Sequence, residues 1–267
     1  MLQKSAARSV IYNRLLGYIK KNLRPLKYLY VKLFRVQDLS ALAKLFRSDK
    51  YGAHRYTQHY AHHFSPRKHE KLKVLEIGIG GYDDPLSGGA SLRMWKNYFP
   101  KSFIYGLDIC DKKSHDERRV KTYQGSQIDE AFLRRVLSDI GKADIIIDDG
   151  SHQNSHVIST FQFLFPLLAN DGIYVVEDTQ TSYWAEYGGS SHELNSPETM
   201  MGFFKGLLDG LNAVEIRSDR PRSYFDKHIV SMHFYHNLIF IYKGDNDEPR
   251  GSSSADASGR RPNDRSH

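Results

Sequence analysis

Two pairs of adjacent carboxylates are the residues in this sequence best suited to chemistry. Asp148 and Asp149 follow the apolar run "ADIII", and Glu177 and Asp178 follow the apolar run "IYVV". A chain that needed only a turn there could use Asn-Gly or Ser-Gly, which carry no charge. Because like charges that are partly buried repel one another strongly, the pairs predict a positive group close by.

A divalent metal ion is one positive group that would suit these acids. If both apolar runs are parallel strands, their carboxyl ends meet at one edge of a sheet, where ligands of open α/β sheets bind. Magnesium prefers oxygen ligands and keeps positions open for water or substrate. We therefore predict a three-carboxylate magnesium site. The alternative is that Asp149-Gly150 is an ordinary turn, but this leaves Glu177 and Asp178 unexplained.

His152 lies three residues beyond Asp149, at the expected start of a helix. An alcohol does not lose its proton at neutral pH unaided, whereas a metal ion bound to its oxygen lowers its pKa. Histidine titrates near neutrality and accepts protons in many active sites. We therefore predict that His152 is a general base for a hydroxyl substrate, with a helix N-terminal role as the alternative.

The stretch "VLEIGIGGYDDP" predicts a nucleotide-binding loop after a strand, with Glu76, Gly78 and Gly80 at its centre. Glycines there let the backbone turn tightly and approach a ligand. A dinucleotide-binding loop needs a third glycine three residues after Gly80, and this chain has Asp83. A carboxylate there disfavours a pyrophosphate but suits S-adenosylmethionine, which carries a cationic sulfonium and an ammonium group.

Further cofactor contacts are expected from the next two strands. Asp108 ends "IYGLD", where an acid can accept both ribose hydroxyl hydrogens. Gly125, Ser126 and Gln127 follow the third strand and are expected at the edge of the adenine ring. For each of these polar residues an ordinary turn is the alternative.

The elements that must position these residues alternate along the chain. Helices are expected at 37–46, 91–99, 129–140, 156–168 and 197–211, and strands at 73–78, 102–109, 120–125, 143–148 and 173–178, followed by β-rich runs at 213–217, 228–235 and 237–243. Alternation of strands and helices predicts a parallel sheet, and the short gap near His236 predicts an antiparallel hairpin. The expected class is α/β: a Rossmann-like, mostly parallel seven-stranded sheet with a C-terminal antiparallel hairpin, as in class I methyltransferases.

Charge divides the chain into three segments. Residues 1–36 hold nine basic residues and no acid, 37–243 are nearly neutral, and 244–267 are rich in Ser, Asp, Arg and Gly. They are expected to be a basic helical arm broken at Pro25, a methyltransferase domain and a disordered tail. Because the basic residues lie outside the catalytic segment, we expect no nucleic-acid partner.

No stretch has the apolar length of a membrane span or the form of a secretory signal, and Cys110 is the single cysteine. These features predict a soluble protein of the cytoplasm. The arm could rest on an anionic membrane surface, or it could be a helical cap or partner-binding arm with a solvated basic face. The sequence also leaves a homo-oligomer open.

Five stretches together resemble a known family: "SDKYGAHRYTQHYAHHF", "VLEIGIGGYDDP", "GLDI", "IDDGSH" and "EDTQTSYW". They are similar to the macrolide sugar O-methyltransferases of the mycinamicin VI 2''-O-methyltransferase and demethylmacrocin O-methyltransferase type. The resemblance covers about residues 38–243. It implies a class I fold, S-adenosylmethionine, magnesium and methyl transfer to a deoxysugar hydroxyl.

Residue roles follow from the resemblance by motif. It implies that Asp149, Glu177 and Asp178 are the metal ligands and His152 the general base. Asp148 would line the cofactor pocket or support it from behind.

Aromatic and hydroxyl residues receive expected roles in the same way. Thr57 and Tyr60 would lie over the cofactor, with a structural aromatic cluster as the alternative. Tyr183 and Trp184 would wall the acceptor site, with core packing as the alternative.

The chain departs from the macrolide enzymes at its N-terminus, where they carry a sizeable auxiliary domain and this sequence has a short basic arm. The expected acceptor is therefore a sugar on a glycan or any glycosylated natural product. Two other functions remain open: a metal-dependent O-methyltransferase of catechol-like phenols, and an NAD-dependent oxidoreductase or non-catalytic protein on the same scaffold.

Overall fold

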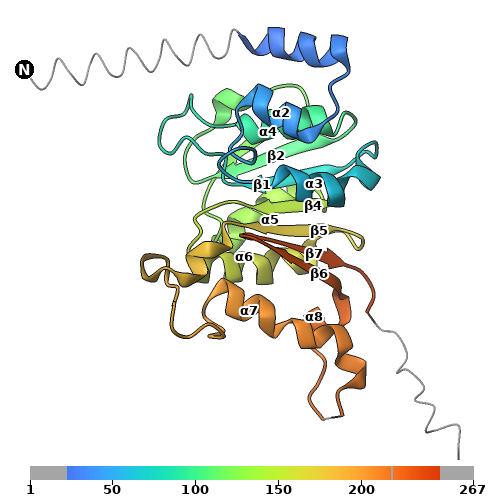
Figure 1. Ribbon diagram of the computed structural model, residues 1–267, viewed down its shortest axis with the longest axis vertical. Helices are drawn as coiled ribbons and strands as arrows, with labels where there is room; N and C mark the ends of the chain where they lie inside the picture. Colours follow the sequence, from blue (N-terminus) through green and yellow to red (C-terminus); the bar gives the residue numbers. More distant parts are fainter. Residues whose placement is uncertain (1–22, 218, 247–267) are drawn as a thin grey trace, which may run out of the picture.

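The sheet of the computed structural model, which describes residues 23–217 and 219–246, has seven strands in the order β3-β2-β1-β4-β5-β7-β6 (Figure 1). Strands β1 to β5 pair in parallel, and β7 pairs antiparallel with β5 and β6. The predicted parallel sheet with a C-terminal antiparallel hairpin is confirmed. The strands are β1 Lys73–Ile77, β2 Phe103–Asp108, β3 Val120–Gln124, β4 Ile145–Asp148, β5 Ile173–Glu177, β6 Ile229–Tyr235 and β7 Leu238–Lys243.

Helices cover both faces of this sheet. The α-helices are α2 Leu39–Phe46, α3 Thr57–Phe64, α4 Ala90–Tyr98, α5 Glu130–Ile140, α6 Asn154–Leu167, α7 Met200–Gly206 and α8 Tyr224–His228. Shorter 3-10 helices are η1 Ser65–Arg67, η2 Lys113–His115, η3 Thr179–Tyr183, η4 Ala185–Tyr187 and η5 Leu208–Glu215. Residues 23–34 are also helical and lie at one end of the molecule, opposite α7 and α8 (Figure 1).

Strand alternation divides the core into two layers. Val74 and Ile104 face α2, α3 and α4, whereas Leu75 and Leu107 face α5, α6 and α7. Both layers are fully buried, since successive strand residues point to opposite faces of a sheet and this sheet is covered on each face. The polar residues that the sequence predicts to form a site therefore lie at the strand ends and in the loops that follow them.

One expected strand is absent from the described residues. The run 213–217 was predicted to be β-rich, but its first three residues belong to η5. Only Ala213 of this run is buried, and Ile216 is exposed. The run therefore has no apolar face to pack on the sheet, and this prediction was wrong.

Residues 23–34 are helical, with Pro25 in the first described turn, so the expected break at Pro25 concerns the junction with residues 1–22 and stays a prediction. Residues 1–22 and 247–267, which hold the rest of the basic arm and the C-terminal tail, lie outside the described residues. The segment boundaries at 36 and 243 stay predictions. Within the described part, no helix combines the length and apolar character needed to cross a membrane.

Candidate active site

The ends of β1, β4 and β5 bring the predicted residues side by side. Ile77 pairs with Asp148, and Asp148 pairs with Val176, so the next residue along each strand lies at the same edge. The backbone N–H of Asp149 donates to the carbonyl of Ile77 over 2.9 Å. At Gly78, with φ +87°, a Cβ atom would lie 1.9 Å from the carbonyl oxygen of Asp149. The close approach of these two strand ends therefore requires glycine.

A lysine that the sequence patterns did not single out lies among the acids. The ammonium of Lys50 is 2.8 Å from Asp149 Oδ2, 2.5 Å from Glu177 Oε1 and 3.3 Å from Glu76 Oε1. Its side chain is only 1% exposed. Burial alone would lower the pKa of Lys50, but Asp149, Glu177 and Glu76 together raise it well above its ordinary value. Lys50 is one positive group that the acidic pairs required.

Burial dominates the electrostatics of these carboxylates. It raises the pKa of Asp149, Glu177 and Glu76, while Lys50 acts in the opposite direction on each. Glu76 also accepts hydrogen bonds from Ser91 Oγ at 2.7 Å and Trp95 Nε1 at 3.2 Å. Its place behind the strand end is fixed by these contacts.

A second acidic group faces His152. Asp149, His152 and Asp178 each offer a ligand atom within 4.8 Å of the others. His152 Nε2 is 3.9 Å from Asp149 Oδ1 and 3.7 Å from Asp178 Oδ2. Nδ1 of His152 is buried and has no hydrogen-bond partner in the described structure. His152 and Asp178 both have positive φ, at 55° and 54°, so local backbone geometry directs both side chains.

The three carboxylates predicted as metal ligands are only partly gathered. Asp149 belongs to the group with His152 and Asp178 and also to a second group with Glu76 and Glu177. Among the described residues, no such group contains Glu177 and Asp178 together. Asp149 is therefore the residue that the two groups share.

Tyr56 is another residue that the sequence patterns did not single out. Its hydroxyl lies 2.7 Å from Asp178 Oδ1 and 3.1 Å from the carbonyl oxygen of Asn237. Burial, followed by the hydrogen bond to Asp178, raises the pKa of Tyr56. The two pairs of adjacent acids indicated that partners were needed, but they did not identify Lys50 and Tyr56 as the residues that supply them.

A pocket of about 200 Å³ lies beside the glycine loop. Gly78 and Gly80, both predicted to bind the cofactor, line it together with Ser91 and Asp149. A cation and an anion that were not predicted, Arg47 and Asp49, also line it. The pocket therefore joins the glycine loop to the acidic group through Asp149.

Asp108 and the turn after β3 lie beside the glycine loop. The carboxylate of Asp108 accepts from the backbone N–H of Ile79 and of Cys110, each over 2.9 Å. The N–H of Gly125 donates to the carbonyl of Asp108 over 2.9 Å, and the carbonyl of Ser126 accepts from the N–H of Asp129. The strand ends of β2 and β3 are thereby tied together.

Gln127 and Asp148 form a buried pair behind the pocket. Gln127 Nε2 is 3.3 Å from Asp148 Oδ1, and its Oε1 accepts from the N–H of Ser151. The hydroxyl of Tyr174 lies 3.2 Å from Asp148 Oδ2. Burial raises the pKa of Asp148 to about 7. These contacts support the acidic loop from behind.

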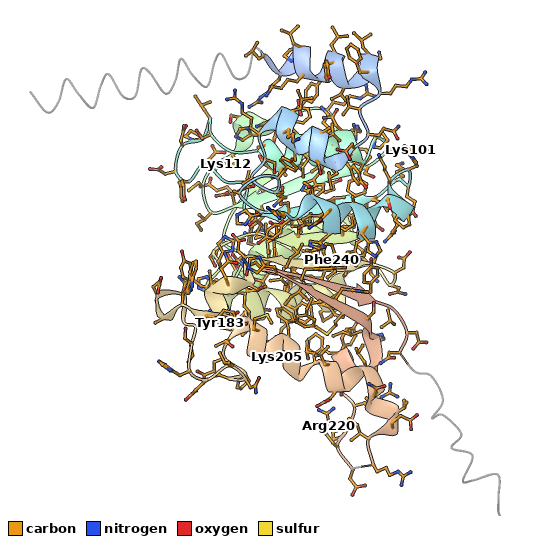
Figure 2. All side chains as sticks on the ribbon, in the orientation of Figure 1. Lys101, Lys112, Tyr183, Lys205, Arg220 and Phe240 are labelled. Atoms are coloured by element: carbon orange, nitrogen blue, oxygen red, sulfur yellow. The ribbon has the colours of Figure 1, made fainter. Side chains whose placement is uncertain are left out.

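The aromatic and hydroxyl residues of the resemblance divide between core and surface. Tyr60 is fully buried, donates to Glu177 and contacts Trp95 and Phe240. Thr57 is buried, and its hydroxyl lies 2.8 Å from that of Ser40. On the segment after β5, Tyr183, which Figure 2 labels, is 38% exposed. Trp184 is 44% exposed, so neither is a core residue.

No family model matches the sequence. The chain is 46% identical over 217 residues to mycinamicin VI 2''-O-methyltransferase of Micromonospora griseorubida, covering 80% of this chain and 54% of that protein. It is 47% identical over 220 residues to 8-demethyl-8-alpha-L-rhamnosyl tetracenomycin-C 2'-O-methyltransferase of Streptomyces olivaceus, covering 82% of this chain and 58% of that protein. The chain thus spans little more than half the length of the curated relatives it matches.

Solved structures agree with these sequence relatives. The MycE methyltransferase of the mycinamycin biosynthetic pathway, in complex with Mg and SAH, matches with a TM-score of 0.78 and 43% identity. That match covers 84% of this chain and 60% of the solved chain. A complex of MycE with Mg, SAH and mycinamycin VI matches with a TM-score of 0.77 and 46% identity, covering 79% of this chain and 55% of the solved chain. The fold is therefore the Rossmann-like methyltransferase fold that the sequence predicted.

Proposed function

Because about four-fifths of the chain is homologous to sugar O-methyltransferases of macrolide and tetracenomycin pathways, we propose that this protein is an S-adenosylmethionine- and magnesium-dependent O-methyltransferase. The proposed acceptor is a sugar hydroxyl of a glycosylated natural product or glycan. The single observation that carries the proposal is the position of Asp149. This residue lines the glycine-loop pocket and also lies close to His152 and Asp178.

The proposed metal ligands are Asp149, Glu177 and Asp178. Their donor chemistry fits magnesium, which prefers carboxylate oxygens. Asp149 and Asp178 offer atoms within 4.8 Å of each other and of His152, and Nδ1 of His152 is a buried atom without a partner in the described residues. When bound, the ion would lower the pKa of the acceptor hydroxyl and fix its position.

The chain's own residues supply the remaining steps. The glycine loop and Asp108 would hold the cofactor so that its sulfonium methyl faces the acidic group. The bound cofactor would give its methyl group to the acceptor hydroxyl oxygen, with its carbon–sulfur bond broken and S-adenosylhomocysteine as the leaving group. The hydroxyl proton passes to Nε2 of His152, which Asp149 and Asp178 flank. Tyr183 and Trp184, which follow β5 and are both partly exposed, would contact the acceptor.

A binding experiment followed by a turnover experiment tests the proposal. Calorimetry should detect S-adenosylhomocysteine binding and no NAD binding. A set of glycosides, supplied with labelled S-adenosylmethionine and magnesium, should then include at least one labelled product whose formation stops in EDTA. NAD binding without S-adenosylhomocysteine binding would reject the proposal, and full turnover in EDTA would reject the metal.

A catechol-like phenol is the second candidate acceptor, because vicinal oxygens also bind a metal ion. The position of His152 favours the sugar, since a phenol is acidic enough to need less help from a base. Catechols belong in the same turnover assay as a competing acceptor class.

We further propose that the enzyme works in the cytoplasm at an anionic membrane surface, through residues 1–36. Six large apolar side chains of the helical residues 23–34 are exposed: Leu23, Leu26, Leu29, Tyr30, Leu33 and Phe34. At 100° per residue they form one continuous stripe, opposite the face that packs on the domain through Tyr28 and Val31. Nine basic residues and no acid in residues 1–36 complement anionic lipids.

Vesicle sedimentation tests this surface. The full chain should sediment with vesicles that contain phosphatidylglycerol and not with phosphatidylcholine alone, and Leu26→Glu with Leu33→Glu should abolish sedimentation. Arg134→Glu, on the exposed face of α5, is the matched control. A dimer that these substitutions dissociate, without vesicle binding by the parent chain, would instead assign the stripe to a homo-oligomer interface.

A further inference from the structure

Each of the three proposed metal ligands has one carboxylate oxygen already held by a side chain from residues 50–60. Asp149 uses Oδ2 for Lys50, Glu177 uses Oε1, and Asp178 uses Oδ1. The donors come from one short segment between α2 and the end of the first turn of α3. They approach the strand ends from the face of the sheet that α2, α3 and α4 cover.

Lys50 holds two of the carboxylates at once. Its ammonium donates to Asp149 Oδ2 over 2.8 Å and to Glu177 Oε1 over 2.5 Å. The hydroxyl of Tyr60 donates to the same Oε1 atom. Lys50 and Tyr60 are at most 1% exposed, so these donors cannot exchange readily with water.

Tyr56 holds the third carboxylate. Its hydroxyl is 2.7 Å from Asp178 Oδ1, and the Tyr56 side chain is 3% exposed. His54 stacks on the ring of Tyr56 at 4.8 Å, and its Nδ1 lies 3.7 Å from the same oxygen. Asp178 is therefore fixed from one side only.

The oxygens of Asp149 and Asp178 that these donors do not engage both lie beside His152. Asp149 Oδ1 and Asp178 Oδ2 are the atoms nearest His152, at 3.9 and 3.7 Å from its Nε2. Both side-chain hydrogen bonds that Glu177 accepts in the described structure go to Oε1, so Oε2 is not engaged by them. Each carboxylate thus offers one oxygen and withholds the other.

Offering one oxygen per carboxylate has a consequence for metal choice. Magnesium requires octahedral geometry at ~2.0–2.1 Å and suits carboxylates that bind through a single oxygen. Calcium accepts about six to eight oxygens at ~2.3–2.6 Å and readily takes both oxygens of a carboxylate. Donors that hold the second oxygen therefore favour the smaller ion, because they prevent bidentate binding.

We propose that Lys50, Tyr56 and Tyr60 are positioning residues that make Asp149, Glu177 and Asp178 bind through one oxygen each and thereby select magnesium over calcium. The inference rests on the proposed metal site. It assigns the segment 50–60 a role in metal selectivity, in addition to any contact with the cofactor.

Tyr56→Phe is the main test, because it removes one hydroxyl and keeps the ring. Calorimetric titration with MgCl₂ and separately with CaCl₂, in the presence of S-adenosylhomocysteine, gives both dissociation constants. Loss of such an outer contact lowers metal affinity by ~10–100-fold, and here the loss should fall on magnesium. Calcium should be affected less, so that the preference for magnesium falls by about tenfold. Lys50→Met should shift the preference in the same direction.

Tyr174→Phe is the matched control. It also removes a buried hydroxyl that bonds to a carboxylate, but that carboxylate is Asp148, which is not a proposed ligand. In Tyr174→Phe the ratio of the calcium dissociation constant to the magnesium dissociation constant should equal that of the parent chain. Equal weakening of both metals in Tyr56→Phe, or no change, would overturn the inference while leaving the metal site intact. Absence of magnesium binding by the parent chain would instead reject the proposed function.

Discussion

A histidine between two carboxylates is the group best placed to accept a proton in the proposed reaction. Nε2 of His152 lies within 4 Å of a carboxylate oxygen of both Asp149 and Asp178, so the two acids border the nitrogen that would take the proton. Nothing in the described structure occupies its Nδ1. The ring is thus oriented by backbone geometry and by the acids on one side.

Replacement of His152 should separate the two acceptor classes. In His152→Ala the catalytic rate with a sugar acceptor should fall by ~10²–10⁴-fold, because general base catalysis is lost. A catechol should lose less, because its hydroxyl is more acidic. Single-turnover assays with both acceptors measure the difference, and His156→Ala, which alters an exposed contact to Ser151, is a nearby control. An unchanged sugar rate would remove His152 as the base.

The acids of the site could be predicted from the sequence, but their partners could not. Asp149, Glu177 and Asp178 follow apolar runs, and strand ends of a parallel sheet must share an edge. Lys50 contacts Asp149 from 99 residues away and Glu177 from 127 residues away, and no spacing rule reaches over such a distance. The sequence indicated that a cation was needed near the acids. We predicted a metal ion there and did not predict Lys50.

At the scale of elements, His63 links α3 to both strands of the β6–β7 hairpin. His63 Nδ1 is 2.8 Å from the hydroxyl of Tyr242, and Nε2 is 2.9 Å from that of Tyr235. Its ring stacks on Phe240 at 4.0 Å, and Phe240 lies in the middle of the molecule (Figure 2). Burial, together with the neighbouring His233, lowers the pKa of His63 to about 4.

This contact predicts that stability falls as the solution becomes acidic. The unfolded chain takes up a proton on His63 near pH 6.5, whereas the folded chain resists it until about pH 4. The contribution is therefore complete above pH 6.5 and is lost as the pH falls toward 4. Between pH 7 and 5 the loss from this residue should be on the order of 1 kcal/mol.

Urea unfolding at pH 7 and pH 5 measures this effect. His63→Phe should show a smaller drop between the two pH values than the parent chain, even if it is less stable at both. His69→Phe, at an exposed position, is the control and should keep the parent slope. An identical drop in His63→Phe would show that the acid sensitivity comes from other groups.

The hairpin could be predicted from sequence because its two strands are separated by two residues and its Asn237 adopts positive φ, which suits asparagine. The run 213–217 could not be judged in the same way. Its residues have strand preference, but burial decides whether a strand forms, and Ile216 is exposed there. Hydrophobic periodicity does not predict the 3-10 helix η5, which forms there instead of a strand.

At the scale of the whole molecule, the helical residues 23–34 are attached to the domain near the glycine-loop pocket. Arg24 lies 3.1 Å from Nδ1 of His115, and Tyr28 bonds to Glu117. His115 in turn contacts the carbonyl of Ser87, whose neighbour Gly88 lines the pocket. The arm and the glycine-loop pocket are thus connected through His115.

Deletion of residues 1–36 should lower the free energy of unfolding but should leave the turnover rate with a soluble acceptor largely unchanged. It removes Arg24 and Tyr28 and should reduce the free energy of unfolding by on the order of 1–3 kcal/mol. Turnover of a soluble acceptor at low temperature should remain, because no proposed catalytic residue lies in the deleted segment. Thermal unfolding and turnover measured side by side give the answer. A folded but inactive deletion would place the arm within the site.

Gly78 limits how such an enzyme can change. Its missing side chain allows the loop that would hold the methyl source to touch the backbone of Asp149, so any larger residue there would disturb both halves of the reaction at once. Substitutions that change which acceptor is methylated therefore cannot occur at Gly78. They are left to surfaces that tolerate replacement, such as the exposed stretch that carries Tyr183 and Trp184.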